Sequence, residues 1–216
     1  MVASVATSPH VTMAIEVDFS AVDAVREEVG ERWREKEGAT LTYLPFLASA
    51  LCRTIAEFPM VNASLIDKAL RVYDHVNLGI AVDLDFQGLV VPVIRAAEEL
   101  TVASIATAAR DLAQRARAKK LGPDDFAGGT YTLTNNGRST YFTAPIINQP
   151  QVAILSTDGV KRRPVVVDDR DTIAVRPIGL LTHAFDHRAI DGAYSAAFLD
   201  RLKRDIEGYD WMSESF

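Results

Sequence analysis

Apolar residues recur every three or four positions from Val22 to Trp33, and this spacing predicts an amphipathic helix. The pattern stops at Gly38, a residue type that is common just after a helix C-terminus. Ser20 and Asp23 stand three positions apart at the start of the pattern, in the arrangement of a capping box. The sequence therefore predicts a helix that starts near Ser20 and ends at Gly38.

Three further helices are predicted from the same kind of periodicity. Leu44–Phe58 is apolar on nearly every side, so we expect a buried helix with Pro45 in its first turn and Pro59 after its end. Apolar positions also repeat at helical spacing over Thr101–Ala116 and Ala193–Ile206.

Short runs of alternating or β-branched apolar residues predict a set of strands. Two of these runs flank Asp85-Phe86-Gln87-Gly88, which has the composition of a hairpin turn. The predicted strands are His10–Val17, Val76–Val82, Leu89–Ile94, Thr130–Thr134, Gln151–Leu155, Val165–Val167, Ile173–Val175 and Ile178–Phe185. Because helices are mixed with hairpin-joined strands, the pattern favours an α+β fold with a mixed β-sheet.

Composition narrows the function classes. Hydrophobic residues make up 48% and charged residues 24% of the 216 positions, which excludes a disordered, collagen-like or coiled-coil chain. The net charge of −6 disfavours general nucleic-acid binding, and no uncharged stretch reads as a membrane span. The single cysteine, Cys52, allows no internal disulfide, and no signal peptide is apparent. We therefore expect a cytoplasmic protein.

Two of the four histidines, His183 and His187, lie in a dense polar segment with Asp191. On a helix, these three residues at i, i+4 and i+8 would place three metal ligands on one face. A zinc protease needs a glutamate directly after its first histidine, however, and position 184 is alanine. The segment before His187 is also strand-like, and Gly192 interrupts any helix. We therefore expect no metal here.

His187 is the candidate general base, because Asp186, Arg188 and Asp191 surround it with charge at the end of a predicted strand. Histidine titrates near neutrality and can take a proton from a thiol or an alcohol. The sequence has no G-x-S-x-G elbow, and Cys52 lies in an apolar helix where packing is its expected role. A base without a protein nucleophile suggests that the substrate brings the nucleophile. The alternative role for His187 is that of a hydrogen-bonded structural histidine at a strand end.

The segment from Asp186 to Gly192, D-H-R-A-I-D-G, resembles the D-H-R-x-x-D-G signature of the acyltransferase (E2) subunits of 2-oxo acid dehydrogenase complexes. Other segments resemble motifs of the same dihydrolipoamide acyltransferase family in the same order: Pro59–Ser64, Val76–Asp83, Gly88–Ile94, Leu121–Asn135 and Pro145–Leu155. The match covers essentially the whole chain. It implies a two-layer α+β sandwich like that of chloramphenicol acetyltransferase, with a single catalytic domain over residues 1–216.

The resemblance also implies a reaction, in which an acyl group moves between dihydrolipoamide and coenzyme A without a metal. Coenzyme A and a lipoyl group on a separate domain or chain would meet in a channel between the subunits of a homotrimer. His187 would deprotonate the coenzyme A thiol, and Thr134 would donate a hydrogen bond to the oxyanion of the tetrahedral intermediate. Asp191 would shape the histidine's loop and form a local ion pair. The residues that match coenzyme A contacts are Arg26, Thr42, Asp83 and Asn135.

Some features differ from the family pattern. The upstream lipoyl and subunit-binding domains are missing, so we expect either an excised core or a stand-alone relative. His183 replaces a usually apolar strand residue, and Arg138–Thr143 has fewer glycines than the usual loop. The end of the chain, Tyr209–Phe216, is more polar than the tail that docks trimers into cages, which favours a trimer over a larger cage.

Two alternative functions stay open. One is a coenzyme A-dependent acetyltransferase for a small-molecule acceptor, which would keep His187 and Thr134. The other is a non-catalytic core that organises the partner subunits of a 2-oxo acid dehydrogenase complex. The sequence leaves the acyl group open among acetyl, succinyl and branched chains.

Overall fold

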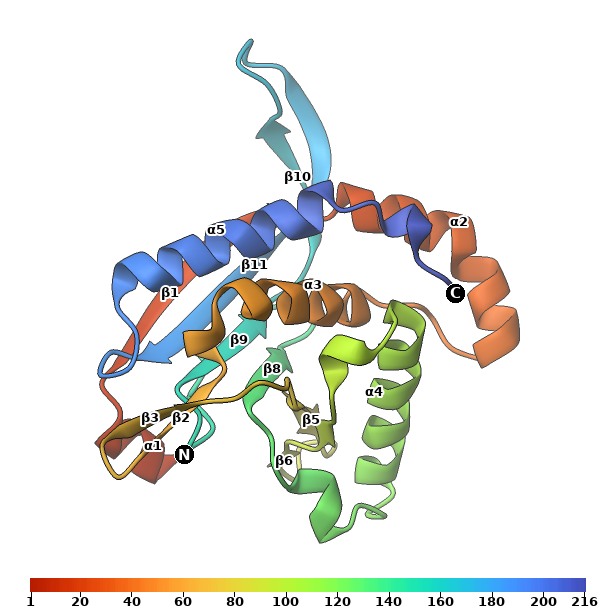
Figure 1. Cartoon of the computed structure of the whole chain (residues 1–216). Helices are drawn as coiled ribbons and strands as arrows, with labels where there is room; N and C mark the ends of the chain where they lie inside the picture. Colours follow the sequence, from red (N-terminus) through yellow and green to blue (C-terminus); the bar gives the residue numbers. More distant parts are fainter.

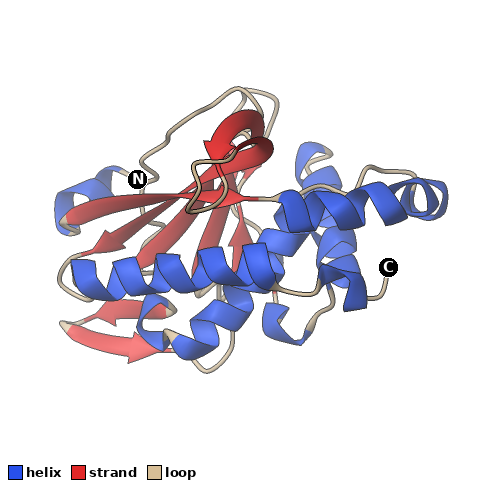
Figure 2. Cartoon of the chain, turned by 90° about the horizontal axis from the view of Figure 1, so that it is seen from above, coloured by secondary structure: helices blue, strands red, loops and turns tan.

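Helices α2, α3, α4 and α5 cover one face of a mixed β-sheet, so the chain has two layers (Figures 1 and 2). The computed structural model describes all residues, 1–216. The helices span Val2–Thr7 (α1), Ser20–Glu37 (α2), Leu44–Glu57 (α3), Val102–Arg117 (α4) and Gly192–Gly208 (α5). This architecture confirms the predicted α+β class and the four predicted helices, whereas α1 was not predicted.

The strand order of the main sheet is β1-β11-β9-β8-β4-β7. These strands span His10–Asp18 (β1), Ile173–Asp186 (β11), Ala153–Thr157 (β9), Tyr131–Asn135 (β8), Leu78–Ile80 (β4) and Val93–Ile94 (β7). Strand β8 runs parallel to both β9 and β4, whereas β11 runs antiparallel to both β1 and β9. The carboxyl end of β11 therefore lies at the opposite end of the sheet from the carboxyl end of β8.

Three hairpins complete the fold. Strand β10 (Lys161–Val166) pairs with the first part of β11, and the two project from the body as an arm (Figure 1). Strands β5 (Val82–Asp83) and β6 (Leu89–Val90) pair across the predicted turn at residues 85–88. The hairpin of β2 (Ala63–Ile66) and β3 (Ala69–Val72) was not predicted.

Three local predictions were wrong. The strands predicted at Val76–Val82 and Leu89–Ile94 are each divided into two short strands, β4 and β5 in the first and β6 and β7 in the second. The capping box does not form, because α2 begins at Ser20 itself, and the Asp18 carboxylate accepts the Ser20 backbone N–H at 2.8 Å. Asp23 instead accepts hydrogen bonds from Arg26 and Tyr43. The strands predicted on either side of Pro177 are one continuous strand, β11.

The core between the sheet and the helices contains one buried histidine. His183 on β11 is fully buried, and its Nδ1 lies 2.8 Å from the Ser195 hydroxyl on α5. The rings of Phe198 and Phe185 lie 4.8 and 5.5 Å from its ring, centroid to centroid. Burial lowers the pKa of His183 to about 3, so the residue is neutral in the folded protein near neutral pH.

Replacing His183 by phenylalanine together with Ser195 by alanine should flatten the pH dependence of stability. Between the folded pKa of about 3 and the ordinary 6.5, only the unfolded chain binds a proton at this residue. Wild-type stability should therefore fall as the pH drops through this window, by about 1.4 kcal/mol per pH unit from this group. Urea unfolding at several pH values between about 4 and 6.5 measures the slope. Equal slopes in the two proteins would contradict the assignment.

Candidate active site

The turn that follows β11 is built around a buried carboxylate. The Asp186 side chain is 1% exposed and accepts hydrogen bonds from Arg188 Nη2 at 2.6 Å and from the Arg188 backbone N–H at 3.0 Å. Burial alone would raise the pKa of Asp186, but hydrogen bonds from Arg188 and Ser8 and the Arg188 charge hold this pKa below its ordinary value. The backbone N–H groups of Ala189 and Ile190 donate to the Asp186 carbonyl. The turn is thus held by hydrogen bonds within the chain itself.

His187 is exposed on this turn, next to Arg188. Its backbone N–H donates to the Pro9 carbonyl at 3.0 Å, which joins the turn to the start of β1. Its ring lies 5.9 Å from the buried Phe185 ring, centroid to centroid, and neither ring nitrogen has a hydrogen-bond partner in the chain. An exposed imidazole with free nitrogens on a rigid turn is suited to proton transfer.

Asp191 begins helix α5. Its side chain accepts the Tyr194 backbone N–H at 2.8 Å, the hydrogen bond of an N-cap. The predicted local ion pair of Asp191 does not form in the chain, because Arg188 is engaged by Asp186 instead. Asp191 therefore shapes the loop of His187 by fixing where the helix starts.

Thr134 lies near the carboxyl end of β8, opposite Ser156 of β9. Its side chain lies on the face of the sheet away from the helices. Tyr131 and Leu133 of the same strand fill the core, and successive strand residues alternate between the two faces. Its hydroxyl has no hydrogen-bond partner in the chain and is available to a ligand.

Hydrogen bonds to β9 fix the loop that follows Thr134. Asn136 Nδ2 donates to the Ser156 hydroxyl at 2.6 Å, and the buried Asp158 carboxylate accepts the Thr143 hydroxyl at 2.8 Å and its N–H at 3.1 Å. A Cβ atom on Gly159 would lie 2.1 Å from the Arg138 carbonyl oxygen, so only glycine at position 159 leaves room for the loop. The polar Asp158-Gly159 pair after a buried strand marks this anchor in the sequence, but its partner, Thr143, is visible only in the fold.

His187 and Thr134 do not come together within one chain. Phe185 lies opposite Ala153, and Thr134 lies opposite Ser156, so the two candidate residues are about five residues apart along the strands. At ~3.3 Å per residue this is on the order of 16 Å, and β9 stands between the two strands. Figure 1 shows the end of β11 and the end of β8 at opposite ends of the sheet.

The four predicted coenzyme A contacts form two separate pairs. Asp83 and Asn135 lie at the same end of the sheet, because β4 and β8 are parallel and Ile80 lies opposite Leu133. Asp83 accepts the Phe86 N–H and Asn135 accepts the Gly137 N–H, so each also stabilises its own turn. This pair is next to Thr134.

The other pair, Arg26 and Thr42, lies at the connection between α2 and α3. Arg26 Nε donates to the Leu41 carbonyl at 2.9 Å, Nη1 pairs with Asp23 at 2.5 Å, and the guanidinium stacks over the Tyr43 ring at 4.0 Å. Burial and the hydrogen bond to Asp23 raise the pKa of Tyr43 to about 12. Thr42 is exposed and makes no side-chain hydrogen bond, and no hydrogen bond joins this pair to Asp83 or Asn135.

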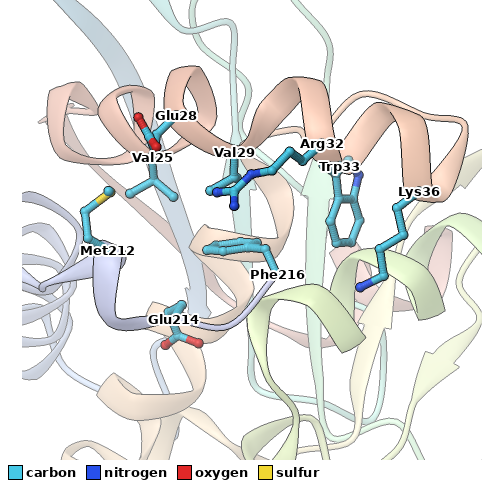
Figure 3. Close-up of a pocket in the computed structure, with 9 residues that line it drawn as sticks. All are labelled: Val25, Glu28, Val29, Arg32, Trp33, Lys36, Met212, Glu214 and Phe216. Atoms are coloured by element: carbon cyan, nitrogen blue, oxygen red, sulfur yellow. The ribbon is translucent and has the colours of Figure 1, made fainter.

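A hollow of about 300 Å³ lies between α2 and the end of the chain (Figure 3). Phe216 forms one wall of it and packs edge-on against Trp33, with ring centroids 6.5 Å apart. Trp211 is buried in the core against Phe46. The chain end is thus more apolar in its packing than its composition predicts, and this hollow contains none of the candidate catalytic residues.

Comparison with known proteins shows the family to which the chain belongs. The family model described as 2-oxoacid dehydrogenases acyltransferase (catalytic domain) matches residues 1–213. The chain belongs to this family. It is 39% identical to the acetyltransferase component of the Mycobacterium bovis pyruvate dehydrogenase complex and 38% identical to a Bartonella vinsonii succinyltransferase component of a 2-oxoglutarate dehydrogenase complex. These matches cover 94% and 93% of the chain but 38% and 48% of the relatives, so the chain spans less than half of their length.

Solved structures of the acyltransferase family have the same fold. A probable dihydrolipoamide acetyltransferase from Listeria monocytogenes superposes with a TM-score of 0.93 at 33% identity, over 99% of this chain and 91% of that one. The dihydrolipoamide acetyltransferase of Azotobacter vinelandii gives 0.88 at 36% identity, over 95% and 84%. Chloramphenicol acetyltransferase, at 16% identity and a TM-score of 0.57 over 93% of this chain and 89% of that one, shares the fold. The predicted family and sandwich fold are therefore confirmed.

No helix in the structure has both the length and the apolar character needed to cross a bilayer.

Replacing Asp191 by alanine is expected to lower the free energy of unfolding by about 1 kcal/mol, because the first turn of α5 loses its cap. Asp191→Asn should retain most of the stability, since an asparagine oxygen accepts the same Tyr194 N–H. Urea unfolding of both variants and the wild type gives the comparison. If asparagine is as damaging as alanine, Asp191 does not act mainly as a cap.

Proposed function

We propose that the chain is the catalytic core of a dihydrolipoamide acyltransferase that moves an acyl group between a dihydrolipoyl group and coenzyme A. The observation that carries this proposal is the spacing of the candidate residues. In the Azotobacter vinelandii enzyme, a serine, a histidine and an asparagine with a role in the catalytic mechanism stand 52 and 4 positions apart. Thr134, His187 and Asp191 stand 53 and 4 positions apart here.

The free hydroxyl and the free imidazole divide the chemistry of thioester exchange between them. His187 takes the proton of the coenzyme A thiol, whose ordinary pKa of about 8.5 is close enough to that of histidine for useful transfer. The thiolate adds to the thioester carbonyl, and the Thr134 hydroxyl donates to the resulting oxyanion. Collapse of this intermediate breaks the bond to the lipoyl sulfur, which leaves as a thiol after taking the proton back from His187.

A trimer supplies the geometry that one chain lacks. Because His187 and Thr134 lie at opposite ends of the sheet, each site combines His187 of one subunit with Thr134 of the next. A head-to-tail contact of this kind closes into a ring when the rotation between subunits is one third of a turn. Asp83 and Asn135, on the Thr134 side, and Arg26 and Thr42 then contact coenzyme A. The partners are a lipoyl domain and the other subunits of a cytoplasmic 2-oxo acid dehydrogenase complex.

Removing the base should nearly abolish turnover. His187→Ala is expected to lower kcat by about 10³-fold or more without unfolding the protein, because His187 is exposed and no core volume is lost.

Thr134→Ala should lower kcat by ~10²–10³-fold with little change in KM, whereas Thr134→Ser should retain most activity. The assay follows acetyl-, succinyl- and isobutyryl-coenzyme A with free dihydrolipoamide. A wild-type protein inactive with every acyl donor would refute the proposal.

The shared site makes a separate prediction for mixtures. Inactive His187→Ala and inactive Thr134→Ala chains, unfolded and refolded together in equal amounts, should recover about a quarter of the wild-type activity. Three quarters of random trimers contain both chains, and each of these has one of three interfaces with both residues intact. Each variant refolded alone is the control. No recovery on mixing, with trimers formed, would contradict a site between subunits.

A further inference from the structure

The proposed mechanism does not use the buried pair of His183 and Ser195, although this pair lies next to the turn that carries His187. His183 is on the last part of β11, four residues before His187, and Ser195 is four residues after Asp191, on the first turns of α5. Both side chains are fully buried, and Nδ1 of one lies 2.8 Å from the hydroxyl of the other. This hydrogen bond ties the strand that enters the turn to the helix that leaves it.

The pair also leads to His187 through contacts between rings. The His183 ring stacks on Phe185 at 5.5 Å and 27°, and the Phe185 ring contacts the His187 ring at 5.9 Å and 38°. The rings of Phe198 and Tyr131 also pack around His183, with their centroids 4.8 and 6.4 Å from the centroid of the His183 ring. No hydrogen bond holds the His187 ring within the chain, so the contact with Phe185 is the one through which the core can orient this ring.

Packing alone would not require a polar pair at this place. His183 Nε2 is buried without a hydrogen-bond partner, and such an atom costs stability that an apolar side chain would not. A hydrogen bond between two rigid elements, in contrast, fixes both the distance between them and the rotation of the ring. A fixed spacing and a fixed His183 ring would hold the support of the base His187 in place, and a productive position must be held within about 0.5 Å.

We propose that His183 and Ser195 form a clasp that positions His187 for proton transfer, acting through Phe185 and through the spacing between β11 and α5. The inference rests on the proposed role of His187 as the base. Neither residue of the clasp touches the substrate, so both are positioning residues.

Replacing the two polar residues separately and together distinguishes an effect on the position of His187 from an effect on stability. Ser195→Ala alone should lower both Tm and kcat, because it leaves the buried Nδ1 without a partner. The pair His183→Phe with Ser195→Ala removes both polar groups and makes room for the larger ring, so its Tm should return to the wild-type range. Its kcat should stay about tenfold below wild type, with KM for coenzyme A within about twofold.

The matched control removes a buried hydroxyl elsewhere. Thr54→Val, in the middle of α3, loses a fully buried hydroxyl that bonds only to the Ala50 carbonyl, and its kcat should equal that of the wild type. If the double variant does not fold, His183→Leu with Ser195→Ala replaces it under the same expectation. A kcat within twofold of wild type in a stable double variant would overturn the clasp. Loss of the proposed function itself looks different, because the wild type would then be inactive or His187→Ala would remain active.

Discussion

The antiparallel run of β11 against β9 determines where chemistry can occur in this molecule. It carries His187 to one end of the sheet, while the parallel strands β4 and β8 bring Asp83, Thr134 and Asn135 to the other end. Reversing β11 would break its pairing with β1 and β9 along its whole length, so the separation is fixed by the topology. The site that we propose, which needs both His187 as base and Thr134 as oxyanion donor, therefore takes one of them from a second copy of the chain.

The D-H-R-x-x-D-G segment divides folding and chemistry among its residues. A carboxylate that is 1% exposed would be costly without partners, and Arg188 supplies these through its side chain and its backbone N–H. The buried Asp186 thereby folds the turn, and Asp191 sets the first residue of α5. The His187 side chain takes part in neither task, which leaves its ring free for the proton transfer that we propose.

Much of the fold could be predicted from periodicity, and the family from its motifs, whereas contacts between distant segments could not. The helices at 44–57 and 102–117 are apolar enough for their spacing to be decisive. The capping box at Ser20 was wrong because Asp18, two residues earlier, binds the same N–H group. The Asp158–Thr143 anchor and the His183–Ser195 pair join segments that no local pattern connects. His183 was visible as an unusual polar residue in an apolar strand, but only the fold shows its partner.

In the trimer that we propose, each chain carries one half of the site at each end, so folding and activity are separate events. A folded single chain exposes His187 without an oxyanion donor and Thr134 without a base, so neither group has a productive partner. In the proposed trimer, association would bring them together and remove water from both, which strengthens the hydrogen bond to a developing oxyanion. The geometry of the turn must then already be correct when the neighbour arrives, since the neighbour contributes its own rigid end, with a loop fixed by Asp158 and Ser156. Rigidity on both sides of the interface is the condition under which two independently folded halves can form one precise site.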